Sequence, residues 1–94
     1  MKSEFYGDKR MTNLTSMRNI GKELERKLKL TGIHSAEDLT ALGSKEAYFK
    51  LKLRFPEVCA VHLYALHGAI ENIDFNMLSE ETKKDLKDFA DELK

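Results

Sequence analysis

The residues best suited to bind a charged ligand gather in one short stretch, Arg18-Asn19-Ile20-Gly21-Lys22. A tight bend there, ending in glycine and leading into a helix, would expose successive backbone N–H groups at the start of that helix. Such N–H groups, together with the helix dipole, form a binding site for phosphate. Cations flank the bend, and Arg26 follows one turn later. The stretch indicates a phosphate-binding site, and the alternative is an ordinary connection between helices with solvated charges.

The histidines and the single cysteine are too scattered for a metal site. Cys59 and His62 are three residues apart and could share one face of a helix. His67 lies about 140° further around the same helix, and His34 belongs to a distant turn. A structural zinc site needs about four ligands, and this spacing supplies two. We therefore predict no metal site and no cofactor.

Cys59 is the one candidate nucleophile. Its place shortly after Pro56, which we expect to open a helix, offers the helix dipole as an activating feature. Its neighbours Val58, Ala60 and Val61 are apolar, however, and such surroundings raise the pKa of a thiol. We predict that Cys59 is buried in the core, that there are no catalytic residues and that the chain is not an enzyme. An enzyme that uses this thiol is the alternative.

Two carboxylate pairs, Glu37/Asp38 and Glu80/Glu81, each fall in the first turn of a predicted helix. Negative side chains at that position complement the helix dipole. The dipole is a sufficient explanation for both pairs, and neither pair indicates acid–base catalysis.

Glycine, serine and proline separate the helices that must position these residues. The apolar spacing predicts helices over 21–30, 35–42, 44–55, 56–70 and 79–93. Gly32 and Gly43 would stop the first two, and Ser35, Ser44 and Ser79 would cap the next ones. The helix over 56–70 is apolar on nearly every face, which predicts that it is the central buried helix. No segment alternates as a strand, so we expect an all-α fold: a single compact bundle of about five short helices.

Length and composition set limits on the class of protein. A chain of 94 residues holds one domain, which we expect over 12–94 after a loose segment over 1–11. No apolar run reaches the roughly 18 residues that span a bilayer, and the first four residues open no signal peptide. A single cysteine excludes an internal disulfide. These features predict a cytoplasmic protein without a membrane partner.

The formal net charge of zero hides a split along the chain. Residues 1–54 carry 12 basic and 7 acidic side chains, a net of +5, whereas residues 55–94 carry 4 and 9, a net of −5. The basic half could provide a surface for an anionic partner. Complementary halves could also pair head to tail between copies, or hold an oppositely charged protein. The third possibility is that the charges serve solubility alone.

The bend and the landmarks after it resemble a known family. Arg18-Asn19-Ile20-Gly21 looks like the hairpin of a helix-hairpin-helix motif, whose usual form is Pro-Gly, an apolar residue and Gly. The wider match runs over about residues 12–92 and includes Asn19-Ile20-Gly21-Lys22, Gly32-Ile33-His34-Ser35, Leu42-Gly43 and Leu63-Tyr64-Ala65-Leu66-His67-Gly68-Ala69-Ile70. Together these residues resemble the TfoX C-terminal domain family, the second domain of bacterial regulators of competence for DNA uptake.

This resemblance implies an all-α fold with a helix-hairpin-helix-like unit and a part in DNA-linked regulation. Longer family members carry a preceding domain of different fold, so we expect a stand-alone version here. Asn19 replaces the first hairpin glycine, and asparagine tolerates the left-handed region better than most residues. Glu25 stands where such motifs commonly have a small alanine. Both departures are compatible with a hairpin that is retained for packing.

The sequence thus favours a non-enzymatic, DNA-associated regulatory module related to competence regulators. It would bind nucleic-acid phosphate weakly and without sequence specificity, since phosphate contacts do not read bases. The residues expected to carry this binding are Arg18, Asn19, Ile20, Gly21, Lys22 and Arg26. The alternative is a protein-interaction module, or a homo-oligomerising helical domain, with no direct DNA contact.

Overall fold

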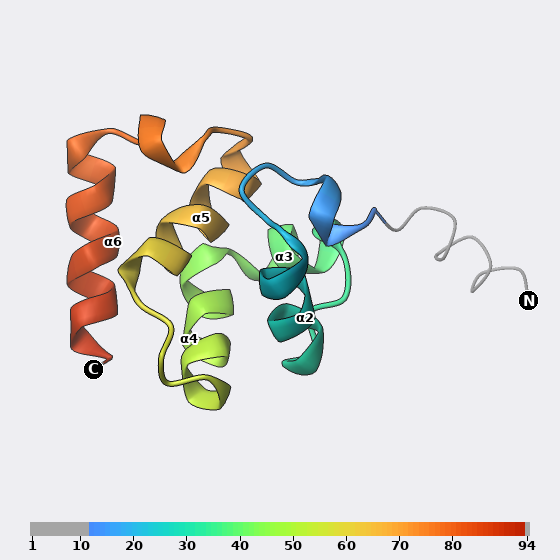
Figure 1. Cartoon of the computed structure of the whole chain (residues 1–94). Coiled ribbons are helices and arrows are strands. Elements are labelled where there is room, and N and C mark those ends of the chain that lie inside the picture. Colours follow the sequence, from blue (N-terminus) through green and yellow to red (C-terminus); the bar gives the residue numbers. More distant parts are fainter. Residues whose placement is uncertain (1–11, 94) are drawn as a thin grey trace, which may run out of the picture.

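A computed structural model describes residues 12–93, and the expected loose segment over 1–11 lies outside this range. All regular structure in the described range is helical, which confirms the all-α prediction (Figure 1). Five α-helices and two short 3₁₀ turns follow one another in this order: η1 (Leu14–Ser16), α2 (Lys22–Leu30), α3 (Ala36–Leu42), α4 (Ser44–Arg54), α5 (Ala60–Glu71), η2 (Phe75–Met77) and α6 (Glu80–Glu92).

Helix α5 is the central element, as its apolar composition predicts. It packs against α4 along one side and against α6 along another. Leu63, Leu66 and Ala69 of this helix are buried in a single core, to which η1, α2, α3 and α4 also contribute. Burial of these side chains supplies the main favourable free energy of the fold.

Local residue chemistry sets several helix ends as expected. Gly32 adopts a left-handed φ of 92° after α2, and the N–H groups of Gly32 and Ile33 donate to the carbonyls of Lys29 and Leu28. This pattern is a Schellman motif. The Ser35 hydroxyl accepts the N–H of Asp38 at the start of α3, and the Ser79 side chain accepts the N–H of Thr82 at the start of α6.

Two helix starts differ from the prediction. Pro56 does not open α5, because the chain makes a turn there and Val58 is buried, with its N–H bonded to the Phe55 carbonyl. The helix begins four residues later, at Ala60. Ser44 is not a cap either: it is already the first residue of α4, and Gly43, at a φ of 92°, stands at the N-cap.

Candidate nucleic-acid interface

The turn that precedes α2 is built around a left-handed asparagine. The chain leaves η1 at Met17, reverses through Asn19 at a φ of 73°, and enters α2 at Gly21. Ile20 is only 5% exposed and belongs to the main core. Asn19 therefore fills the position of the missing hairpin glycine, as its tolerance of this region predicts.

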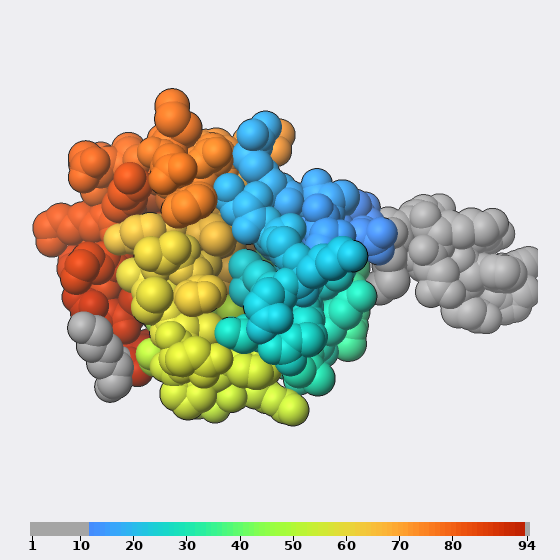
Figure 2. All heavy atoms as spheres, in the orientation of Figure 1, coloured from blue at the N-terminus to red at the C-terminus, as the bar shows by residue number. Residues whose placement is uncertain are grey.

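The Asn19 side chain points into the molecule and joins segments that lie far apart in the sequence. Its Nδ2 donates to the carbonyls of Ala65 (3.3 Å) and Ile73 (3.0 Å), and its Oδ1 accepts the N–H of Phe75 at 3.2 Å. The space-filling view shows the segment around residue 20 against the connection from α5 to η2 (Figure 2). Asn19 thus satisfies one backbone group of α5 and two of the segment that follows it, and so holds the turn in place.

Gly68 of α5 makes this approach possible. A Cβ atom at this position would lie 2.5 Å from the Asn19 Nδ2 and 2.5 Å from the Ile73 carbonyl oxygen. Only a residue without a side chain lets α5, the turn and the following loop come this close.

Other residues of the same turn face solvent. Gly21 and Lys22 are exposed, and no side chain caps the start of α2. The first intrahelical bond joins the Glu25 N–H to the Gly21 carbonyl, so the N–H groups before it have no helical acceptor. Arg18 is also exposed, and its Nε donates to the Asn72 side chain at 3.4 Å. This side presents open donors between two cations.

Two carboxylates share that helix start. Glu23 holds Arg26 through a pair of hydrogen bonds of 2.6 and 3.3 Å, and the Arg26 guanidinium lowers the pKa of Glu23. Glu25 lies 3.7 Å from Lys29. The structure therefore separates the six expected site residues. Gly21 and Lys22 lie at the open helix start, the Arg18 side chain donates to Asn72, Asn19 and Ile20 face the interior, and Arg26 is paired.

The charge split along the sequence is partly cancelled within the fold. Lys27 binds Glu57 at 3.1 Å, and Lys45 binds Asp85 at 2.9 Å, so each pair joins the basic half to the acidic half. These pairs offset the charge of two of the lysines in the basic half. Lys52, another cation of the basic half, donates hydrogen bonds to the carbonyl oxygens of Pro56 and Val58.

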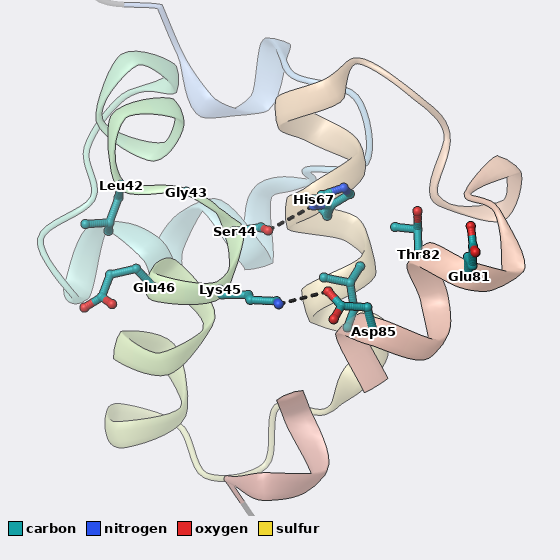
Figure 3. Close-up of a pocket in the computed structure, with 10 residues that line it drawn as sticks. Leu42, Gly43, Ser44, Lys45, Glu46, His67, Glu81, Thr82 and Asp85 are labelled. Atoms are coloured by element: carbon teal, nitrogen blue, oxygen red, sulfur yellow. Dashed lines mark hydrogen bonds and ion pairs between the residues drawn. The ribbon is translucent and has the colours of Figure 1, made fainter. Parts of the chain in front are cut away.

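A polar cleft of about 730 Å³ between α4, α5 and α6 was not expected from the sequence. The Ser44 hydroxyl lies 3.1 Å from Nδ1 of His67, and the Lys45–Asp85 ion pair lies beside them (Figure 3). A serine–histidine pair supports nucleophilic catalysis when a third group orients the histidine. Within residues 12–93, no carboxylate makes a hydrogen bond to His67. The sequence suggested Ser44 only as a helix cap, and no sequence pattern indicated that its hydroxyl contacts His67.

The prediction that Cys59 is a core residue is wrong, because its side chain is exposed at the N-cap of α5. The turn over 56–58 buries Val58 in its place. The Cys59 N–H donates to Nδ1 of His62 at 3.0 Å, and the thiol lies 3.8 Å from the same nitrogen. Partial burial is the main cause that lowers the pKa of His62. The His62 imidazole thus closes the start of this helix by accepting the Cys59 N–H.

The described residues also limit the kinds of site that this structure offers. Among the residues that the structure describes, no three His, Cys, Asp or Glu side chains are grouped to hold a metal ion. None of the helices in that range is long and apolar enough to cross a membrane.

The fold and the turn define a small, all-helical domain packed around α5, with a left-handed turn leading into α2. The chain belongs to the TfoX C-terminal domain family, whose sequence model matches residues 10–90 and so confirms the resemblance. The family is of a regulatory type.

Solved structures of similar proteins support the fold. One is a crystal structure of an uncharacterized protein from Listeria monocytogenes in a triclinic form, which shares 40% identity and a TM-score of 0.84. The match covers 87% of this chain and 93% of the other. A tetragonal form of a Listeria monocytogenes protein of unknown function gives the same identity and TM-score, with 87% and 100% coverage. No curated protein matches the chain.

Proposed function

We propose that this domain is a non-enzymatic regulatory module that contacts the phosphate backbone of DNA through the open start of α2. The observation that carries the proposal is the exposed, uncapped helix N-terminus at Gly21, which stands between Arg18 and Lys22. Free N–H groups at a helix start, with cations beside them, are suited to a phosphate oxygen. The module would act in the cytoplasm, in competence-related regulation as in the longer family members.

The same geometry limits the affinity. Glu23 and Glu25 place two negative charges in the first turn of α2, and Arg26 is occupied by Glu23. Few cations remain for phosphate, so we expect a complex of micromolar affinity or weaker that dissociates further as salt is added. Contacts of this kind carry no sequence preference.

A matched pair of charge variants tests the proposal. Gly21→Glu places a carboxylate at the helix start, where φ is −94° and an added Cβ meets nothing within 4 Å, so the fold is retained. Lys84→Glu changes the net charge by twice as much on α6, where Lys84 is exposed and forms an ion pair with Asp88. The measurement is a titration of labelled duplex DNA at about 50 mM salt.

We expect Gly21→Glu to weaken binding about tenfold and Lys84→Glu to weaken it about twofold or less, since a repelled phosphate contact costs more than a distant charge. Equal losses of affinity in the two variants would show that the turn is not the contact with DNA. The same holds if wild-type protein does not bind DNA at low salt.

The second candidate is a protein-interaction module without direct DNA contact. It is favoured by the use of Asn19 and Ile20, the central residues of the turn, for internal packing. A turn retained only to join α2 to α5 would leave recognition to other surfaces of the domain. A wild-type protein that does not bind DNA at low salt would support this candidate.

A further inference from the structure

Two pairs of large apolar side chains remain exposed on parts of the molecule that the proposed function does not use, and Leu30 of α2 and Val61 of α5 are exposed singly. On α4, Leu53 is 70% exposed and Phe49 is 38% exposed. In the connection from α5 to α6, Met77 is 74% exposed and Ile73 is 38% exposed. Exposed apolar side chains bounded by charged residues are typical of protein-interaction sites.

Helix α4 is apolar on opposite sides. Ala47, Tyr48 and Leu51 are buried against the core, whereas Phe49 and Leu53, four residues apart, share the outer side. The next residue after each of these two is a cation. We call Phe49, Lys50, Leu53 and Arg54 the α4 surface.

The α4 surface is positively charged. Lys50 and Arg54 form no ion pair within residues 12–93, unlike Lys45 of the same helix, which binds Asp85. Glu46, near the start of the helix, is the one carboxylate of α4. Because the two free cations directly adjoin the apolar pair, a partner surface with carboxylates around an apolar centre would fit here.

The connection from α5 to α6 has that composition. Residues 71–81, which we call the acidic segment, contain no lysine or arginine and surround Ile73 and Met77 with carboxylates. These carboxylates are exposed and form no ion pair within the described part of the chain: Glu71, Asp74, Glu80 and Glu81. The acidic segment is therefore opposite in charge to the α4 surface and matches it in apolar content.

The two surfaces cannot meet within one molecule. In Figure 1, α4 lies at the lower edge of the domain, and the connection that carries η2 runs along the upper edge, with α5 between them. We propose that copies of this chain associate head to tail, with the α4 surface of one copy docked on the acidic segment of the next. Both surfaces of a copy can be occupied at once, so repeated contacts of this kind produce an open linear oligomer.

The size of the contact makes the association weak. Helix α4 has 11 residues and is about 16 Å long, which places the interface below the about 1,200 Å² of stable complexes. We expect oligomers at protein concentrations of about 0.1–1 mM and their loss at high salt, because the rim charges are screened. A contact between two different surfaces does not close on itself as a twofold interface does.

Mixing two blocked variants provides the decisive experiment. Leu53→Glu disables the α4 surface and leaves the acidic segment intact, and Met77→Lys does the reverse. Both side chains are largely exposed, so each variant should keep the wild-type helical circular dichroism. In sedimentation at low salt, wild-type protein should form species that grow with concentration, and each variant alone should be a monomer. An equal mixture of the two should form a dimer of one copy of each and nothing larger.

Val61→Glu is the matched control, since Val61 is half exposed on α5 and belongs to neither surface. It should associate like the wild type. A mixture that stays monomeric while the wild type associates would overturn the proposal, as would a wild type that is monomeric at every concentration at low salt. None of these residues belongs to the turn over 18–22, so the outcome is independent of DNA binding.

Discussion

The two sides of the turn over residues 18–22 differ in what they contact. The inner side, formed by Asn19 and Ile20, is bonded to α5 and its following loop or buried in the core. The outer side, formed by Arg18, Gly21 and Lys22, is exposed and leads to a helix start without a cap. Five consecutive residues thus divide between fold stability and potential binding.

The difference shows why a hairpin pattern alone does not establish a function. The hairpin pattern consists of a left-handed position, an apolar residue and a glycine. The fold uses the first two of these, Asn19 and Ile20, for internal packing. The proposed phosphate contact would depend instead on the charges around the helix start, where the carboxylates Glu23 and Glu25 oppose the cations. Separate variants on the two sides can test this division.

The largest effect is expected from Gly68→Ala, which blocks the inner side. The added Cβ would meet the Asn19 amide and the Ile73 carbonyl oxygen, each at 2.5 Å, and a backbone oxygen cannot move aside freely. We expect a loss of about 3 kcal/mol in the free energy of unfolding, measured by urea denaturation.

Gly21→Ala is the control for that substitution on the outer side. An added Cβ there meets nothing within 4 Å, and the φ of −94° suits any residue. Its effect should stay within about 0.5 kcal/mol. Similar losses for both variants would show that the inner side is not specially constrained.

A smaller effect is expected from replacing Asn19 itself. Asn19→Gly removes the hydrogen bonds to Ile73 and Phe75 but keeps the left-handed backbone, and we expect a loss of about 1.5 kcal/mol. Asn19→Ala also strains the φ of 73°, which adds about 1 kcal/mol. In a domain of this size each kcal/mol lowers the melting temperature by about 4–8 °C. An alanine variant as stable as the glycine variant would contradict the backbone argument.

Sequence reasoning succeeded where the governing interaction is local. Gly32 ends α2 because only a left-handed residue completes the hydrogen bonds to Leu28 and Lys29. Ser35 and Ser79 accept N–H groups three residues ahead, so their roles are readable from a short window. The apolar composition of α5 likewise identified the central helix.

Sequence reasoning failed where partners come from distant segments. Apolar neighbours suggested that Cys59 is buried, yet burial of Val58 instead turns the thiol outward. The Ser44 hydroxyl bonds His67, 23 residues away, and this cross-helix pair has no local signature. For the turn, the pattern located the bend before α2, but it could not show that Asn19 and Ile20 face the interior while Gly21 and Lys22 are exposed.

The smallest effect is expected from Glu23→Gln, which acts on the outer side alone. Glu23 is the carboxylate that holds Arg26 at the start of α2. Its removal leaves Arg26 free for phosphate, so DNA affinity at low salt should rise about threefold, and the salt dependence should steepen by about one released ion. Glu80→Gln makes the same charge change in the first turn of α6 and should alter affinity less. An equal gain in DNA affinity for both variants would show that net charge explains the binding. The outer side would then matter no more than any other part of the surface.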